Sequence, residues 1–320
     1  MKKLFLIFFL VILFSAAYGT KVYSQSLTLE ASVQAGILNL NTKEKLLYEN
    51  GSTLSTLSLL DWKTTIIPCI ALDTQLCIAD TFYIKAGGQF TLPFSAGTMK
   101  DYDWQNIVST GGTELTRYSE HKNSLNRLYD AELCFGVGGS ITPSVRLVQF
   151  FSVKYSYQSV TAKNGWRQYG QKLDENNEIY APWSKDIEKK TMNGKSVTFE
   201  TQDIFLGLGT QLIFSFNDAF SMKLFINILP SLNSKALDTH YKRDLYTYFD
   251  FCSKLEFDAK ILLEYKINKA NFVTVQTGFS AAAAENGVVF QNSQKLDKYP
   301  GAVTAMSWSF LLGYTYRCEK

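Results

Sequence analysis

The feature that most constrains the fold is a period-two alternation of apolar and polar residues, which recurs along most of the chain. The clearest example runs from Phe249 to Tyr265, where apolar side chains occupy one set of alternate positions and mostly charged side chains the other. Such alternation is typical of a strand with one apolar and one polar face, because a helix would scatter the charges around its circumference. We therefore expect an all-β chain.

Two all-β architectures fit this pattern, a soluble sandwich and a transmembrane barrel. Alternation also marks 82–90, 220–228 and 306–316, and aromatic residues gather near strand ends. Apolar bands with aromatic rims, facing a charged interior, are typical of a barrel in lipid, where every backbone group must be paired and a closed sheet leaves no edge. We favour the barrel over the sandwich.

The connections predict the topology. Short turn signals and longer polar stretches alternate along the chain, as expected for periplasmic turns and extracellular loops. The turns lie near 73–80, 142–144, 217–218 and 268–270, and the loops at 41–55, 98–124, 164–196, 237–245 and 286–302. These connections predict a ten-stranded antiparallel transmembrane β-barrel with both termini at the periplasmic side. Several strands exceed the ~9–11 residues of a membrane crossing, so the barrel should project outward.

The first residues have the pattern of a secretory signal peptide. Lys2 and Lys3 precede an apolar run at 4–14, and small residues follow it. This run is shorter than the ~20 residues of a membrane-spanning helix, so export is favoured over a retained anchor. Cleavage is expected after Gly19 or Ser24, with Ser24 preferred. We thus expect a signal peptide at 1–24 and one barrel domain at 25–320, located in the cell outer membrane.

Charge and cysteine content exclude several classes of partner and cofactor. The 32 Lys and Arg residues nearly balance the 29 Asp and Glu residues, and removing the signal peptide makes the numbers equal. Nothing therefore favours nucleic-acid binding. Five scattered Cys and only two His give no zinc motif, so we expect no metal or other cofactor. The cysteines are interpreted mostly as small wall residues.

Two acidic motifs stand out in the predicted loops. One is Asp101-Tyr102-Asp103-Trp104, and the other is Asp238-Thr239-His240-Tyr241. Each alone fits a solvated loop. Both belong to the same outward rim, however, so closure of the barrel would bring them together across its mouth.

These motifs, together with three others, resemble those of the omptin family of outer-membrane proteases. The others are Leu60-Asp61-Trp62-Lys63, Ser119 with His121, and the closing Gly313-Tyr314-Thr315-Tyr316. Their order and spacing match over nearly the whole mature chain. The resemblance implies a ten-stranded aspartyl-type endopeptidase that uses a water nucleophile, with no covalent intermediate and no catalytic metal.

The resemblance also implies roles for individual residues. The His-Asp pair of the family falls on His240 and Asp238, and its aspartate couple falls on Asp101 and Asp103. A histidine can accept a proton from water near neutral pH, and a neighbouring aspartate can orient it. Two like charges close together should raise the pKa of one aspartate. Ser119 and His121 do not predict a serine hydrolase, because two neighbouring loop residues are poorly placed to hydrogen-bond; His121 is expected to be a loop residue near the site.

The match departs from the family at its binding positions. Family members cleave next to Lys or Arg, recognised by two acids; one falls on Glu44 and the other on Ala236, which carries no charge. We therefore expect a weakened preference for a basic residue, with Glu44 as the remaining substrate-binding anchor. For lipopolysaccharide, Lys154 keeps the charge of a lipid-binding position whereas Glu200 reverses another, so dependence on this lipid is doubtful.

The expected partners follow from this interpretation. They are surface or extracellular polypeptides, cleaved near basic residues, and the outer-membrane lipid, with the chain a monomer and its site facing outward. The alternative is a non-catalytic barrel of the same scaffold, either an adhesin or a porin-like protein.

Overall fold

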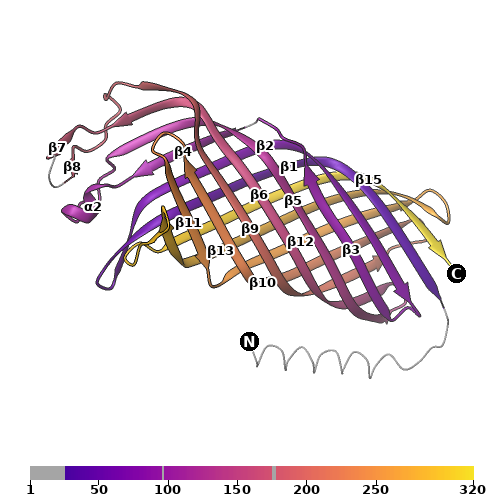
Figure 1. The fold of residues 1–320 in the computed structure, drawn as a ribbon. Helices are drawn as coiled ribbons and strands as arrows, with labels where there is room; N and C mark the ends of the chain where they lie inside the picture. Colours follow the sequence, from indigo (N-terminus) through magenta and orange to yellow (C-terminus); the bar gives the residue numbers. More distant parts are fainter. Residues whose placement is uncertain (1–25, 96, 175–177) are drawn as a thin grey trace.

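The computed structural model describes residues 26–95, 97–174 and 178–320. The predicted signal peptide, with its cleavage site, lies outside the described residues. In the described part the chain forms an elongated sheet closed into a barrel, with an additional sheet and helix at the end opposite the C-terminus (Figure 1).

Thirteen strands share one antiparallel sheet. They are β1 (Leu27–Asn50), β2 (Thr53–Ile78), β3 (Phe82–Thr91), β4 (Gly97–Asp103), β5 (Arg117–Thr142), β6 (Val145–Tyr169), β9 (Lys190–Ser215), β10 (Phe220–His240), β11 (Leu245–Phe251), β12 (Lys254–Lys266), β13 (Asn271–Gln291), β14 (Gln294–Lys295) and β15 (Gly301–Glu319). Outside the sheet lie α2 (Asn106–Ser109) and a small sheet of β7 (Lys172–Asp174) and β8 (Ile179–Tyr180). No helix among the described residues is long and apolar enough to cross a membrane.

The main sheet closes because β1 pairs with both β2 and β15. Two places in the ring are each occupied by a pair of successive strands: β3 and β4 lie between β2 and β5, and β11 and β12 lie between β10 and β13. With each pair taken as one interrupted strand and the short β14 set aside, the described ring has ten members. The prediction of an all-β antiparallel barrel is confirmed.

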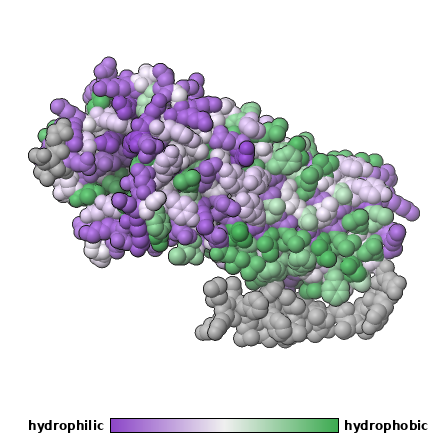
Figure 2. Space-filling view, viewed as in Figure 1, coloured by the Kyte–Doolittle hydropathy of each residue, from purple (hydrophilic) through white to green (hydrophobic). Residues whose placement is uncertain are grey.

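The face of the molecule in Figure 2 has an apolar part and a polar part. Large apolar side chains are exposed along β12 and along β15 from Met306 to Tyr316. Hydrophilic surface covers the opposite end, where α2, β7 and β8 lie. The apolar part has the character of a lipid-facing belt, and the polar part projects beyond it.

A set of irregularities separates the belt from the projecting part. Register shifts occur at 231–233 in β10 and at 284–287 in β13, and residues 252 and 253 separate β11 from β12. They reverse the direction of the side chains: Phe249 and Phe251 are buried, whereas Leu255 is exposed. The prediction that 249–265 forms one strand with a single apolar face is therefore wrong, because the interruption turns the first part of that face inward.

Strands also replace much of the predicted loops. Only residues 51 and 52 separate β1 from β2, and β4 occupies the beginning of the predicted loop 98–124. The four short turns are found near the predicted positions, between β2 and β3, β5 and β6, β9 and β10, and β12 and β13. The projecting part is thus mostly a continuation of the barrel wall.

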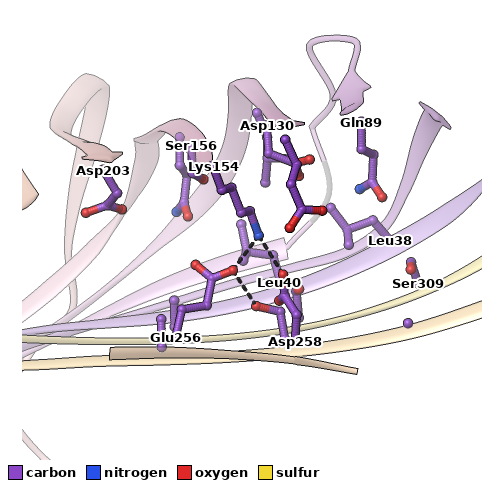
Figure 3. A pocket seen from close by; sticks show the side chains of 18 of the residues that line it. Leu38, Leu40, Gln89, Asp130, Lys154, Ser156, Asp203, Glu256, Asp258 and Ser309 are labelled. Carbon is purple, nitrogen blue, oxygen red and sulfur yellow. Dashed lines mark hydrogen bonds and ion pairs between the residues drawn. The ribbon is translucent and has the colours of Figure 1, made fainter. Parts of the chain in front are cut away.

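Ion pairs fill the interior of the belt. Lys154 bonds to Glu256 and, at 2.9 Å, to Asp258 across the lumen (Figure 3). The expectation that Lys154 binds lipid is therefore wrong: its side chain lies inside the barrel, because the outward positions of β6 fall on its neighbours Val153 and Tyr155. Glu200 does not take part in this ion-pair network; its carboxylate accepts a hydrogen bond of 2.6 Å from the phenol of Tyr157.

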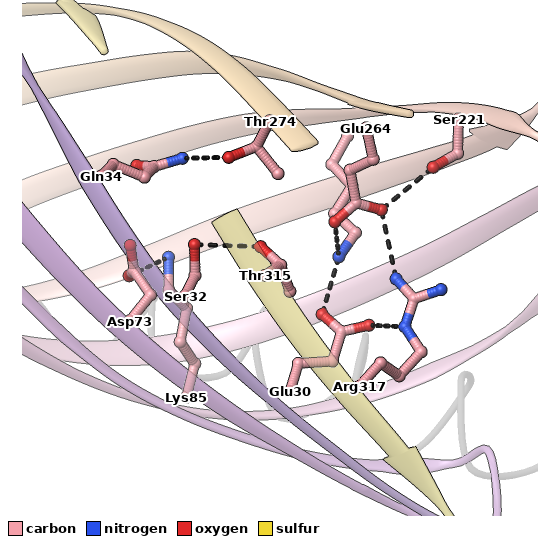
Figure 4. Close-up of polar contacts among 11 residues, drawn as sticks. Glu30, Ser32, Gln34, Asp73, Lys85, Ser221, Glu264, Thr274, Thr315 and Arg317 are labelled. Carbon is pink, nitrogen blue, oxygen red and sulfur yellow. Dashed lines mark hydrogen bonds and ion pairs between the residues drawn. The ribbon is translucent and has the colours of Figure 1, made fainter. Parts of the chain in front are cut away.

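A second network lies near the C-terminal end of the lumen (Figure 4). Lys223 contacts Glu30 at 2.8 Å and Glu264 at 2.9 Å. Arg317 contacts the same two acids at 2.6 and 3.2 Å. Arg317 belongs to β15, so the chain after Tyr316 continues the barrel wall.

Candidate active site

The aspartate couple lies at the mouth of the projecting part, on β4. Asp101 and Asp103 occupy alternate positions and are both buried, which places the two carboxyl groups on the inner face of the same short strand. Asp101 pairs in register with Leu60 of β2 and Ser119 of β5. Two strands therefore fix the couple from both sides, above the lipid-facing belt.

The second pair lies at the end of β10. Asp238 and His240 again occupy alternate positions, and His240 Nε2 lies 2.6 Å from Asp238 Oδ2. The Asp238 side chain is 3% exposed and that of His240 is 14% exposed. Burial alone would lower the pKa of His240, but the charge and hydrogen bond of Asp238 raise it above its ordinary value. The pair is thus arranged to stabilise a protonated imidazole.

The two pairs act on each other across the mouth. Burial and the charge of Asp103 raise the pKa of Asp101 to about 7, against the opposing effect of His240. Asp103, Asp238 and His240 also line one cleft of about 500 Å³. The structure therefore brings together the four residues that the sequence singled out for catalysis.

Glu44 completes this acidic site from β1. It is 3% exposed and lines the same cleft. Burial, followed by the charges of Asp238 and Asp101, raises the pKa of Glu44 well above its ordinary value. Glu44 Oε2 and Asp238 Oδ1 are both buried and have no hydrogen-bond donor. The Glu44 and Asp238 side chains lie close enough for the charge of Asp238 to act on Glu44.

Ala236 lies one step deeper on the inner face of β10. It is 2% exposed, pairs in register with Phe249 and belongs to a buried apolar cluster with Phe249 and Phe251. The position where the resemblance expects a second acid is therefore an apolar part of the wall.

Ser119 and His121 lie on β5 and not in a loop. Both are buried, and Ser119 Oγ lies 3.0 Å from His121 Nε2 and 3.5 Å from Asp101 Oδ2. The prediction of poor hydrogen-bonding geometry is thus wrong, because alternate residues of a strand share one face. Burial lowers the pKa of His121. Neither residue lines the cleft, and Ser119 contacts Asp101 from the neighbouring strand.

Arg243 is the charged residue that sequence reasoning missed. It lies in the turn after β10, lines the cleft, and its charge opposes the rise in the pKa of Asp101. Its place three residues after His240 was the only available signal. Within the described ranges, no group of three or more His, Cys, Asp and Glu side chains is placed to hold a metal ion.

Comparisons with known proteins place this chain in a family. A model of the Omptin family matches residues 24–307. A comparison with curated protein sequences finds no match. The crystal structure of outer membrane protease OmpT from Escherichia coli is similar, with a TM-score of 0.77, 18% identity, and coverage of 91% of this chain and 97% of that chain. OprG from Pseudomonas aeruginosa is far less similar, with a TM-score of 0.31, 8% identity, and coverage of 92% and 96%.

Proposed function

Because this chain belongs to the omptin family, we propose that it is an outer-membrane endopeptidase that hydrolyses surface or extracellular polypeptides. The observation that carries the proposal is the meeting of the two pairs: Asp238 and His240 line one cleft with Asp103, and the charges of these three residues act on Asp101. The cleft lies in the part of the barrel that projects beyond the lipid-facing belt. We propose that this part faces outward, where extracellular polypeptides can reach the site.

The proposed nucleophile is a water molecule held between the two pairs. His240 accepts a proton from this water as it attacks the peptide carbonyl, and Asp238 stabilises the imidazolium that forms. The imidazolium then gives the proton to the leaving amine. This sequence requires neutral His240 at the start, and it leaves no covalent bond between enzyme and substrate.

Asp101 and Asp103 are proposed to hydrogen-bond the two reacting oxygen atoms, that of the peptide carbonyl and that of the attacking water. With a pKa of about 7, Asp101 is partly protonated near neutral pH and can donate a hydrogen bond to the oxyanion of the tetrahedral intermediate. Its partner Asp103 offers carboxyl oxygens that can accept a hydrogen bond from the attacking water. The aspartyl type of the enzyme rests on this division of roles.

Substrate preference is proposed to be a weakened form of the basic preference that the family resemblance implies. Ala236 supplies no charge, and burial together with the charge of Asp238 raises the pKa of Glu44 well above its ordinary value. Basic residues elsewhere in the substrate would face Asp103 and Glu178, which also line the cleft.

The porin-like alternative is disfavoured by the lumen. Lys154, Lys223 and Arg317 form ion pairs there with acids from other strands, so paired side chains occupy these levels of the lumen. No observation favours an adhesin. The chain is proposed to act as a monomer, and dependence on lipopolysaccharide stays doubtful because Lys154 is engaged inside.

The test is hydrolysis of fluorogenic peptides by the refolded protein, compared with His240→Ala and Asp101→Ala. We expect cleavage by the parent protein and a large loss in both variants. Equal activity in all three proteins would contradict the mechanism, and a folded but inactive parent would favour the non-catalytic barrel.

A further inference from the structure

A row of cations lies on the inner face of the projecting wall, beside the aspartate couple. Asp101 pairs in register with Ser119, and Ser119 pairs with Arg167. Arg167 in turn pairs with Lys190. Residues directly opposite each other on antiparallel strands share a face of the sheet, and Asp101 is buried on the inner face with its contact Ser119. Arg167 on β6 and Lys190 on β9 therefore belong to the same inner face.

Two more arginines extend this row. Arg117 lies opposite Asp103 and Tyr169, and Arg243 lines the cleft from the turn after β10. The guanidinium carbons of Arg117 and Arg167 lie 5.3 and 5.1 Å from the centre of the Tyr169 ring, and the charge of Arg243 acts on the same tyrosine. Three arginines thus gather at one ring. We call the four cations the basic rim: Arg117, Arg167, Lys190 and Arg243.

The basic rim is not neutralised by ion pairs within the described part of the chain. The charges of Asp103 and Asp101 act on Arg243, but no described acid forms an ion pair with any member of the rim. The Nε of Arg117 is buried and donates no hydrogen bond. Like charges directly opposite each other, as at residues 167 and 190, destabilise a sheet. This arrangement is typical of a surface that binds an anion from outside the chain.

The position of the rim indicates where that anion comes from. The rim lies on the inner face, and Arg243 belongs both to it and to the cleft, so an anion that reaches the rim enters with the substrate. Neighbouring strands lie ~4.8 Å apart, which places Arg167, two strands from Asp101, about 10 Å away. An extended peptide advances ~3.3 Å per residue. About three residues of substrate would therefore span the distance.

We propose that the basic rim binds an acidic side chain of the polypeptide substrate, about three residues from the scissile bond. This inference rests on the proposed endopeptidase function and adds a second specificity position to it. The acidic cleft contacts the basic residue of the substrate, and the rim contacts the acidic one. A single exposed ion pair changes kcat/KM by about fivefold at most, and salt screens it.

The test uses the refolded mature protein and peptides that carry one Arg among small neutral residues. Glu is placed in turn at successive positions on either side of this Arg, the matched control peptides carry Gln, and mass spectrometry identifies the cleaved bond. About three residues from that bond, Glu should raise kcat/KM about fivefold over Gln, and high salt should remove the advantage. Equal values for Glu and Gln at every position overturn the proposal and leave the endopeptidase function standing.

Two lysines of β9 provide matched variants. Lys190→Gln removes a cation of the rim, and Lys195→Gln removes an exposed cation of the outer face, because Lys195 pairs with Lys163, which follows the buried Ala162. The Glu advantage should fall in Lys190→Gln and in Arg167→Gln, and it should persist in Lys195→Gln. An advantage that survives in the double variant of Arg167 and Lys190 contradicts the proposal.

A binding measurement separates this inference from the proposed function. Fluorescence anisotropy with the His240→Ala variant compares the affinity of the Glu and Gln peptides without turnover. Tighter binding of the Glu peptide, lost when the two rim cations are also replaced by Gln, supports the rim even if the parent protein cleaves no peptide. Equal binding of both peptides overturns the proposal whether or not the parent protein cleaves them.

Discussion

Replacing Asp238 by asparagine tests the proposed mechanism most directly. The change keeps the shape of the side chain and removes the charge that lies 2.6 Å from His240 Nε2. Two unit charges about 4 Å apart interact by about 4 kcal/mol at an effective dielectric constant of about 20. If this interaction develops in the transition state, as His240 becomes protonated, its loss corresponds to about a thousandfold in kcat.

The same variant should change the pH dependence. The charge of Asp238 raises the pKa of His240 against the effect of burial, so removing the charge leaves burial dominant and lowers that pKa. His240 must be neutral to accept a proton, and activity is lost as pH falls through its pKa. The acidic limb of kcat/KM should therefore move to lower pH in Asp238→Asn.

The assay is fluorogenic peptide hydrolysis from acidic to alkaline pH, with folding monitored by circular dichroism. Asp61→Asn is the matched control, because Asp61 carries the same group on the projecting part but pairs at 3.7 Å with the half-exposed Lys63. A loss smaller than tenfold in Asp238→Asn, or an acidic limb that does not move, would refute the assignment of His240 as the base.

Three further predictions follow from the described contacts. Asp101→Asn should lower kcat by about 100-fold or more and remove the titration near pH 7 that belongs to Asp101; an unchanged profile would contradict its role. Lys154→Met leaves Glu256 and Asp258 without their shared cation and should cost about 3–5 kcal/mol in urea unfolding, whereas Lys295→Met, in an exposed pair, should change it little. Similar midpoints in both would contradict the interior network. In planar bilayers the parent protein should show no steady ion conductance, and open channels would favour the porin-like alternative.

The sequence predicted the barrel but could not predict which way every strand faces. In a strand, odd and even positions point to opposite faces, so the sequence pattern assigns each side chain to one face. The irregularities near 231–233 and 252–253 exchange the two faces although the apolar–polar pattern continues through them. Phe249 and Phe251 thus lie inside although their positions continue the apolar face that Leu255 presents outward. Nothing in the spacing distinguishes the two cases. The prediction that Lys154 binds lipid was wrong for a related reason. Knowing that residue 154 belongs to a strand does not tell whether its side chain points into the barrel or toward lipid.

The candidate site was predictable where its residues are close in sequence. Asp238 and His240 lie two apart, and a strand brings such residues to one face. The same rule applies to Ser119 and His121, but the expected loop concealed it. The meeting of Glu44 with Asp238 depends on closure of the whole ring, so no local pattern predicts it.

The interior ion pairs have a consequence for how the barrel assembles. Glu30 on the first strand meets Arg317 on the last, and Lys223 from the middle of the chain joins them. A slip of one residue would turn every side chain of a strand to the opposite face and expose such cations to lipid, where a charge costs about 2–4 kcal/mol at mid-depth. The network thus favours the correct register when the barrel closes, because only correctly aligned first and last strands bring Glu30 and Arg317 into contact.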